Sequence, residues 1–348
     1  MKILKNPFRR VGMSNPALTD FPAPSLDWQR PVDLLKRCPR AGVTPLTQSE
    51  TLAKHCDVAE VILKDERSRM GLGSFKALGA AYVIACDHAA GIARGATYIT
   101  ASAGNHGMSV AAGAAAFGAY SVVYIAETVP QSFADRLAQV GAQVVREGAD
   151  YEASMQAAAR AAKAQRAILL SDSSWPGYVE RPHRLMEGYL ALMAEVFEQM
   201  VQTPTHVFLQ AGVGGLAGSA AAMVRDHWGD GPRVVVVEPE AAPALFASIE
   251  AGAPVATSGP SSQMGRLDCK EPSYIALKGL ARDGDFFVTL SEEEGLEGAR
   301  LAEESGLAST PSGAAGLAGL LASSRHRSTL SLDENARVLL ILSESPET

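Results

Sequence analysis

The middle of this chain repeats a pattern of short apolar segments and alanine-rich segments, and that repetition constrains the fold more than any other feature. The segments predicted as strands and helices alternate in the order 97–100, 105–117, 121–125, 131–140, 143–145, 150–165 and 167–170. Repeated strand–helix units are typical of an α/β fold. The strands lack polar alternation, which predicts a parallel sheet covered by helices on both faces.

A second series of strands follows a predicted helix at 180–201. We predict its strands from apolar, β-branched segments at 206–210, 233–237 and 336–342. The strand-like segment 59–63 is expected to join this second sheet, although it precedes the first series in the chain. The larger domain is therefore predicted to be discontinuous.

These two series predict a two-domain protein with an active site between the domains. We place the large domain at 1–84 and 176–348, and a small mobile domain at 85–175. Parallel sheets bind ligands at the carboxyl ends of their strands, so the loops at those ends are where we expect functional residues.

Charge and cysteine content exclude several classes of partner. The 348 residues carry 38 acidic and 31 basic side chains, without a basic tract, which argues against nucleic acid or an anionic membrane as a partner. The four cysteines are widely spaced, and neither a metal site nor disulfides are expected. No signal peptide is recognisable, and segment 109–119 is too short to span a bilayer. We therefore predict a cytoplasmic location.

Lys76 is the first candidate catalytic residue. It lies in Gly71-Leu72-Gly73-Ser74-Phe75-Lys76-Ala77-Leu78-Gly79, between a predicted strand and a predicted helix. The start of a helix disfavours a cation, and apolar surroundings lower the pKa of an amine. We expect both effects to lower the pKa of Lys76 and to favour a neutral amine that attacks an aldehyde. The alternative is an exposed lysine without a function.

The loop Ser102-Ala103-Gly104-Asn105-His106 follows the 97–100 strand and begins a helix. Free backbone N–H groups at such a position bind a carboxylate, and the Asn105 amide can donate to a ring oxygen. The alternative is that Ser102 or Asn105 only caps the helix. We expect His106 to be packed in the interior and not to act as a base.

A glycine-rich loop, Gly212-Val213-Gly214-Gly215-Leu216, follows the 206–210 strand. Its consecutive N–H groups can hold a phosphate. The same loop matches a dinucleotide fingerprint through Gly212, Gly214 and Ala217, with Glu238 placed to bind a ribose. A nicotinamide-dependent oxidoreductase is therefore an alternative at this point.

Two further strand ends carry polar residues. Ser343 ends the last predicted strand, where its hydroxyl can bind a heterocycle nitrogen. Asp172 lies in Ser171-Asp172-Ser173-Ser174-Trp175-Pro176-Gly177-Tyr178, and we expect Asp172, Trp175 and Tyr178 to line the cleft. An Asx-turn is the alternative for Asp172.

In their order along the chain, these loops resemble those of the fold-type-II pyridoxal-phosphate enzymes, the tryptophan synthase β-like family. The resemblance extends from Thr44 to Ser343 and implies pyridoxal 5'-phosphate as the cofactor. By it, Lys76 forms a Schiff base with the cofactor, Phe75 lies against it, Asn105 binds its ring oxygen and Ser343 faces its pyridine nitrogen. The implied phosphate site consists of Gly212, Val213, Gly214, Gly215 and Leu216. The implied substrate-carboxylate site consists of Ser102, Ala103, Gly104, Asn105 and His106.

Within that family the chain is most similar to the diaminopropionate ammonia-lyase group. The similarity extends to segments 71–79, 172–178 and 264–273 and to Glu238-Pro239. Members of that group carry an aspartate at the position of Ala103, where it helps to process the D-substrate, so Ala103 argues against D-isomers. Asp172 is retained, whereas Ser345 replaces the usual glycine.

The resemblance implies α,β-elimination on a small L-amino acid such as 2,3-diaminopropionate, giving a 2-oxo acid and ammonia. Lys76 would be the base, and Asp172 would contact the group at Cβ. A serine, threonine or 3-hydroxyaspartate dehydratase shares the same motifs, and a β-replacement synthase is a further alternative. Family members are commonly homodimers, which we expect here as well.

Overall fold

Strands from distant parts of the chain form a seven-stranded sheet in the computed structural model, which describes residues 1–346. Five interior strands run parallel, and the two edge strands are antiparallel to their neighbours. The order across this large sheet is β1 (Lys2–Lys5), β10 (Phe286–Leu290), β9 (Arg233–Pro239), β8 (His206–Gln210), β11 (Arg337–Leu342), β3 (Glu60–Asp65) and β2 (Leu46–Gln48).

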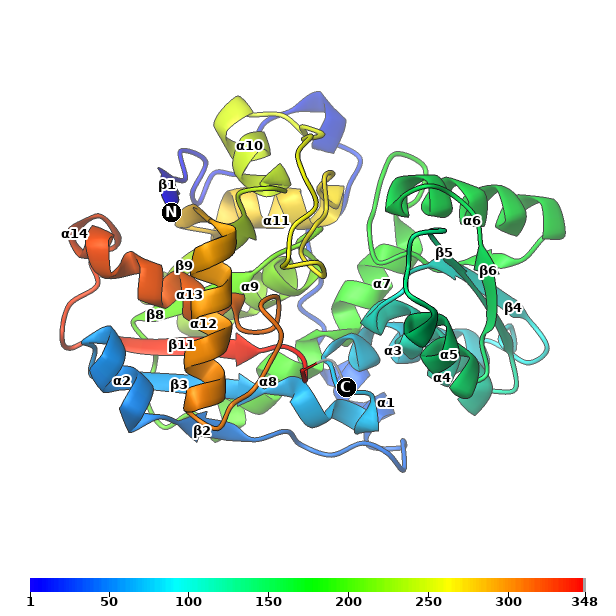
Figure 1. The fold of residues 1–348 in the computed structure, drawn as a ribbon, viewed down its shortest axis with the longest axis horizontal. Helices are drawn as coiled ribbons and strands as arrows, with labels where there is room; N and C mark the ends of the chain where they lie inside the picture. The colour runs from blue at the N-terminus through cyan, green and yellow to red at the C-terminus, as the bar shows by residue number, and fades with distance from the viewer. Residues whose placement is uncertain (347–348) are drawn as a thin grey trace.

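A separate four-stranded parallel sheet lies beside the large one (Figure 1). Its order is β6 (Gln143–Arg146), β5 (Tyr120–Ile125), β4 (Thr97–Ala101) and β7 (Ile168–Leu169). The helices of this part are α4 (Asn105–Ala116), α5 (Gln131–Gln139) and α6 (Tyr151–Gln165). Alternating strand and helix produce this unit as the sequence pattern predicts.

Two helices between the sheets, α3 (Lys76–Ala89) and α7 (Glu180–Gly188), are in close contact (Figure 1). A Cβ on Gly188 would lie 2.7 Å from the Leu78 carbonyl oxygen, so only glycine permits this approach. The other helices are α1 (Gln29–Leu35), α2 (Glu50–Cys56), α8 (Leu190–Gln199), α9 (Gly215–Trp228), α10 (Ala244–Ala251), α11 (Tyr274–Asp283), α12 (Glu292–Glu304), α13 (Ala315–Ala322) and α14 (Arg327–Leu330).

The predicted fold class is confirmed, and the segment 59–63 does join the large sheet, beside β11. The predicted helix 180–201 is instead two helices, α7 and α8, which meet at Tyr189. Strands β1, β2 and β10 were not predicted. The first two are short edge strands, in which two of the four residues of β1 and two of the three of β2 are polar or charged. Strand β10 is an apolar segment too short for periodicity to distinguish from a helix. No helix within residues 1–346 is long and apolar enough to cross a membrane.

Candidate active site

One cavity of about 1060 Å³ lies at the carboxyl ends of strands from both sheets. Loops that follow β3, β4, β8 and β11 all contribute to its wall, as expected for parallel sheets. Every site residue predicted from the sequence lines this cavity, namely Phe75, Lys76, Ser102, Ala103, Gly104, Asn105, His106, Asp172, Gly212, Val213, Gly214, Gly215, Leu216 and Ser343.

Lys76 and Asp172 form an ion pair in this cavity. Lys76 is the first residue of α3, and its Nζ donates a hydrogen bond to Asp172 Oδ2. The lysine side chain is 21% exposed and the aspartate side chain 12%. The predicted Asx-turn alternative therefore does not describe the Asp172 carboxylate, which binds the lysine.

The expectation of a lowered Lys76 pKa is wrong for this structure. Burial does act to lower the pKa, but the charge of Asp172, the weaker influence of Tyr189 and the hydrogen bond to Asp172 together exceed it. The pKa of Lys76 is therefore raised above its usual value. Burial acts to raise the pKa of Asp172, and the charges of Lys76 and His106 outweigh this and hold it well below its usual range.

Buried polar groups surround the pair. Tyr189 Oη and His106 Nδ1 have no hydrogen-bond partner among residues 1–346. The other ring nitrogen of His106 lies 2.9 Å from the Leu170 carbonyl oxygen, and burial lowers the pKa of the imidazole. His106 is thus packed in the interior, as predicted. The edge of one ring in the Phe75–Tyr189 pair faces the other, with centroids 4.9 Å apart.

The glycine loop at the start of α9 has room for backbone and not for side chains. Gly214 has a φ of 97°, which L side chains rarely adopt, and it is the N-cap of the helix. A Cβ on Gly212 would lie 2.9 Å from Cys269 Sγ. Backbone N–H groups at a helix N-terminus form a site for a phosphate.

Asn105 and Ser343 face the cavity from the two different sheets. Gly104, not Asn105 or Ser102, is the N-cap residue of α4, and it forms no side-chain capping bond. The capping interpretation of Ser102 and Asn105 is therefore wrong. The Asn105 amide Nδ2 instead donates to Glu344 Oε2, which belongs to the residue after Ser343.

Glu238 cannot serve as a ribose-binding acid in this fold. Its two carboxyl oxygens accept hydrogen bonds from the backbone N–H groups of Leu245 and Phe246, at 2.8 and 2.7 Å. The residue is 1% exposed, and burial raises its pKa to about 8. A dinucleotide site needs an acidic side chain that is free to bind the ribose, and Glu238 is not free to do so. The oxidoreductase alternative is therefore wrong.

Trp175 and Tyr178 also differ from expectation. Their rings stack on each other with centroids 4.5 Å apart, and Tyr178 Oη donates to the Leu169 carbonyl oxygen. They stabilise the turn after β7 and do not line the cavity wall as predicted. Within residues 1–346, no group of three or more His, Cys, Asp or Glu residues is arranged to hold a metal ion.

The cavity is lined by a primary amine, a glycine-rich turn at a helix N-terminus, an amide and a hydroxyl, and these groups fit pyridoxal phosphate. Residues 38–344 match the family described as "Pyridoxal-phosphate dependent enzyme". The chain belongs to the pyridoxal-phosphate-dependent enzymes. Its cofactor is pyridoxal phosphate, as in this family and in the solved relatives, and it is an enzyme of the ammonia-lyase and dehydratase group.

Individual relatives within this family are ammonia-lyases. The chain is 30% identical to diaminopropionate ammonia-lyase of Salmonella typhimurium, covering 89% of this chain and 86% of that one. It is 26% identical to L-threonine ammonia-lyase of Thermotoga maritima, covering 75% and 63%. The crystal structure of diaminopropionate ammonia-lyase from Escherichia coli in complex with D-serine is similar with a TM-score of 0.89 and 27% identity, covering 99% of this chain and 93% of that chain.

The sequence does not predict several residues at the site, and Tyr189, Arg266 and Glu344 are the ones that contact predicted site residues. Tyr189 lies between α7 and α8, in a segment whose sequence indicates only a helix. Arg266 lies in segment 264–273, where the sequence shows only the family similarity, and it lines the cavity. Glu344 is buried beside the predicted Ser343. The sequence signal for Glu344 is an acidic residue two positions after an apolar strand, next to Ser343.

Proposed function

We propose that this enzyme catalyses α,β-elimination on a small L-amino acid with an amino group at Cβ, such as 2,3-diaminopropionate. The observation that carries this proposal is the ion pair between Lys76 and Asp172 inside the cavity. Pyridoxal phosphate supplies a ring that withdraws electrons from Cα when it is bound. The chain must supply a base and a site for the β-substituent.

Lys76 is assigned the role of base for the Cα proton, and it needs an unprotonated Nζ for that role. Asp172 opposes this, because its carboxylate raises the pKa of Lys76. A substrate with a β-ammonium group would compete with Lys76 for Asp172. The Asp172 carboxylate, which opposes burial most strongly, would then be paired with the substrate. Burial would lower the pKa of Lys76 as a result.

The remaining roles are those that the family resemblance implies, and the loops that carry them line the same cavity. The N–H groups of the Ser102–His106 turn would bind the substrate carboxylate, and the Gly212–Leu216 turn would bind the cofactor phosphate. Phe75 would pack against the cofactor and Asn105 would donate to its ring oxygen. Ser343 would present an uncharged hydroxyl to the pyridine nitrogen.

A substrate screen tests this proposal. L-2,3-diaminopropionate, L-serine, L-threonine, 3-hydroxyaspartate and the D-isomers would each be assayed for 2-oxo acid and ammonia, with Lys76→Ala as the inactive control. We expect diaminopropionate to give the highest kcat/KM. A higher kcat/KM for serine or threonine would show that the enzyme is a dehydratase instead. Ala103, in the cavity wall, is compatible with that activity. Product formation by Lys76→Ala at the wild-type rate would refute the role of Lys76.

Two broader predictions accompany the proposal. We expect a homodimer, which light scattering of the purified holoenzyme would test. We also expect a cytoplasmic enzyme, and fractionation of cells expressing the untagged chain would test that.

A further inference from the structure

Glu344 occupies a fixed position beside the Lys76 turn. The backbone on either side of it is hydrogen-bonded to that turn: Phe75 N donates to the Ser343 oxygen at 3.1 Å, and Ser345 N donates to the Gly73 oxygen at 2.9 Å. Glu344 itself is 3% exposed. A buried carboxylate persists only where hydrogen bonds and opposite charge compensate it, so its partners show its purpose.

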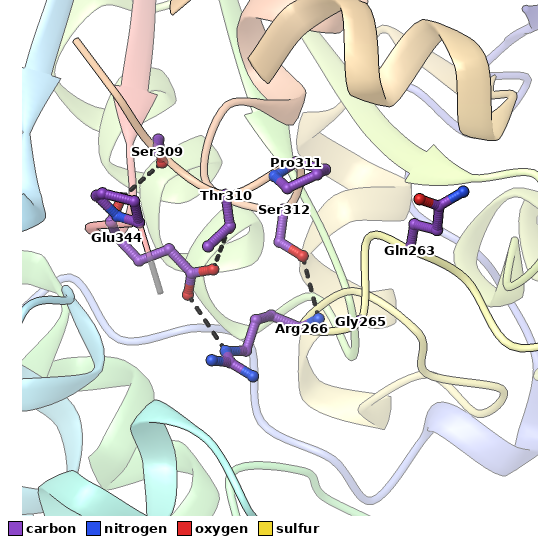
Figure 2. Close-up of a pocket in the computed structure, with 9 residues that line it drawn as sticks. Gln263, Gly265, Arg266, Ser309, Thr310, Pro311, Ser312 and Glu344 are labelled. Carbon is purple, nitrogen blue, oxygen red and sulfur yellow. Dashed lines mark hydrogen bonds and ion pairs between the residues drawn. The ribbon is translucent and has the colours of Figure 1, made fainter. Parts of the chain in front are cut away.

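Figure 2 shows the partners of Glu344 in the part of the chain that contains the seven-stranded sheet, which we call the large-sheet unit; the part with the four-stranded sheet is the small-sheet unit. Thr310 Oγ1 donates to its Oε1, and Ser309 Oγ donates to its backbone oxygen at 2.6 Å. Arg266 Nε lies 3.7 Å from Oε2, and the Arg266 backbone N–H donates to Ser312 Oγ at 3.1 Å (Figure 2). These residues line a second cavity of about 330 Å³ next to the cofactor cavity.

The same carboxylate and arginine reach the small-sheet unit. Asn105 Nδ2, at the start of α4, donates to Glu344 Oε2 across 239 positions of sequence. A Cβ on Gly104 would lie 3.1 Å from Arg266 Nε, so the arginine packs directly on the preceding residue. Its Cζ also lies 5.6 Å from the Phe133 ring centroid. Glu344 and Arg266 therefore hold the 104–105 turn from the large-sheet side.

We propose that Glu344 is a positioning residue that orients the Asn105 amide toward the cofactor. A side-chain amide has two N–H donors. Donating one of them to a fixed carboxylate sets the plane of the amide and leaves the other donor for the ring oxygen of pyridoxal phosphate. The inference rests on the proposed role of Asn105. The new element is that Asn105, which follows a strand of the four-stranded sheet, depends for its cofactor contact on Glu344, which follows a strand of the seven-stranded sheet.

A double-mutant cycle on cofactor binding tests this without any assay of turnover. Pyridoxal phosphate would be titrated into cofactor-free wild-type protein and into Glu344→Ala, Asn105→Ala and the double variant, following the visible absorption band and its maximum. We expect Glu344→Ala to weaken binding about tenfold and to shift the band in the same direction as Asn105→Ala. In the Asn105→Ala background, loss of Glu344 should change affinity less than about twofold.

Further variants keep the test decisive. Glu344→Met has a similar volume and no acceptor oxygen, so it enters the same cycle in place of Glu344→Ala if the smaller residue prevents folding. Thr310→Val leaves the carboxylate but removes one anchor, so it should move the band in the same direction by a smaller amount. Glu240→Gln, an exposed acid paired with Lys2, should change nothing. Multiplicative effects in the double variant, or an unshifted band in Glu344→Ala, would overturn the proposal. An Asn105→Ala variant with wild-type affinity would instead refute the role of Asn105.

Discussion

Replacing Asp172 with asparagine removes one charge of the cavity's ion pair and leaves the other. Removing one partner of a buried ion pair costs about 3–5 kcal/mol, because the remaining charge is left without compensation. The Lys76 and Asp172 side chains are 21% and 12% exposed, so water compensates part of this loss. We therefore expect cofactor-free Asp172→Asn to lose about 2–3 kcal/mol of unfolding free energy at pH 7.

The difference in unfolding free energy between wild type and Asp172→Asn should decrease at low pH. The pKa of Asp172 is lowered from 3.8, so the stabilisation by its carboxylate is complete above pH 3.8 and is lost as the pH falls towards its folded pKa. The pKa of Lys76 is raised from 10.5, so its share is complete below pH 10.5 and is lost only at higher pH. The difference between wild type and variant should thus be constant from about pH 5 to 9 and narrow by about 1 kcal/mol at pH 3.

Urea denaturation of the cofactor-free proteins at a series of pH values measures this difference directly. Lys76→Met and the double variant complete the cycle, and the double variant should be more stable than either single variant because no buried charge remains. Glu240→Gln is the exposed control and should show no measurable loss. A loss below about 0.5 kcal/mol at pH 7, or an equal loss at pH 3 and pH 7, would refute the ion-pair argument.

Three other substitutions test the fold and the site. Gly214→Val should weaken binding of pyridoxal phosphate more than about tenfold in a titration, because valine disfavours a φ of 97° and its Cβ would lie 3.0 Å from Leu245; unchanged affinity would contradict the proposed cradle. Gly188→Ala should lower unfolding free energy by about 1–3 kcal/mol through overpacking against Leu78, and an unchanged urea midpoint would argue against the α3–α7 contact. Ala103→Asp should raise the D- to L-diaminopropionate ratio of kcat/KM, which chiral substrate assays would detect, because a carboxylate there can transfer a proton.

Much of this architecture could be predicted because it depends on local pattern. Alternating strand and helix segments over 97–170 are enough to predict a parallel sheet, and the strand ends then predict which loops meet. This is why Lys76, Asn105 and the Gly212–Leu216 loop all line one cavity. The edge strands β1 and β2 escaped prediction because a few residues, most of them polar or charged, carry no clear periodicity.

The ionisation of the site could not be predicted in the same way. From its neighbours in sequence, Lys76 is expected to lose its proton more easily, yet Asp172, 96 positions away, reverses the shift. Glu238 shows the same limitation. Its spacing from the glycine loop suggests a ribose-binding acid, and only the folded chain directs its oxygens to the start of α10.

The sequence by itself determined which chemical groups this protein carries and the order in which strands deliver them, because both follow from residue type and local periodicity. Only the tertiary structure decided which groups touch. It set the charge of Lys76 through Asp172 and joined Asn105 to Glu344. The physical reason is that hydrogen bonds and charge interactions depend on distance in space, which separation along the chain does not reveal.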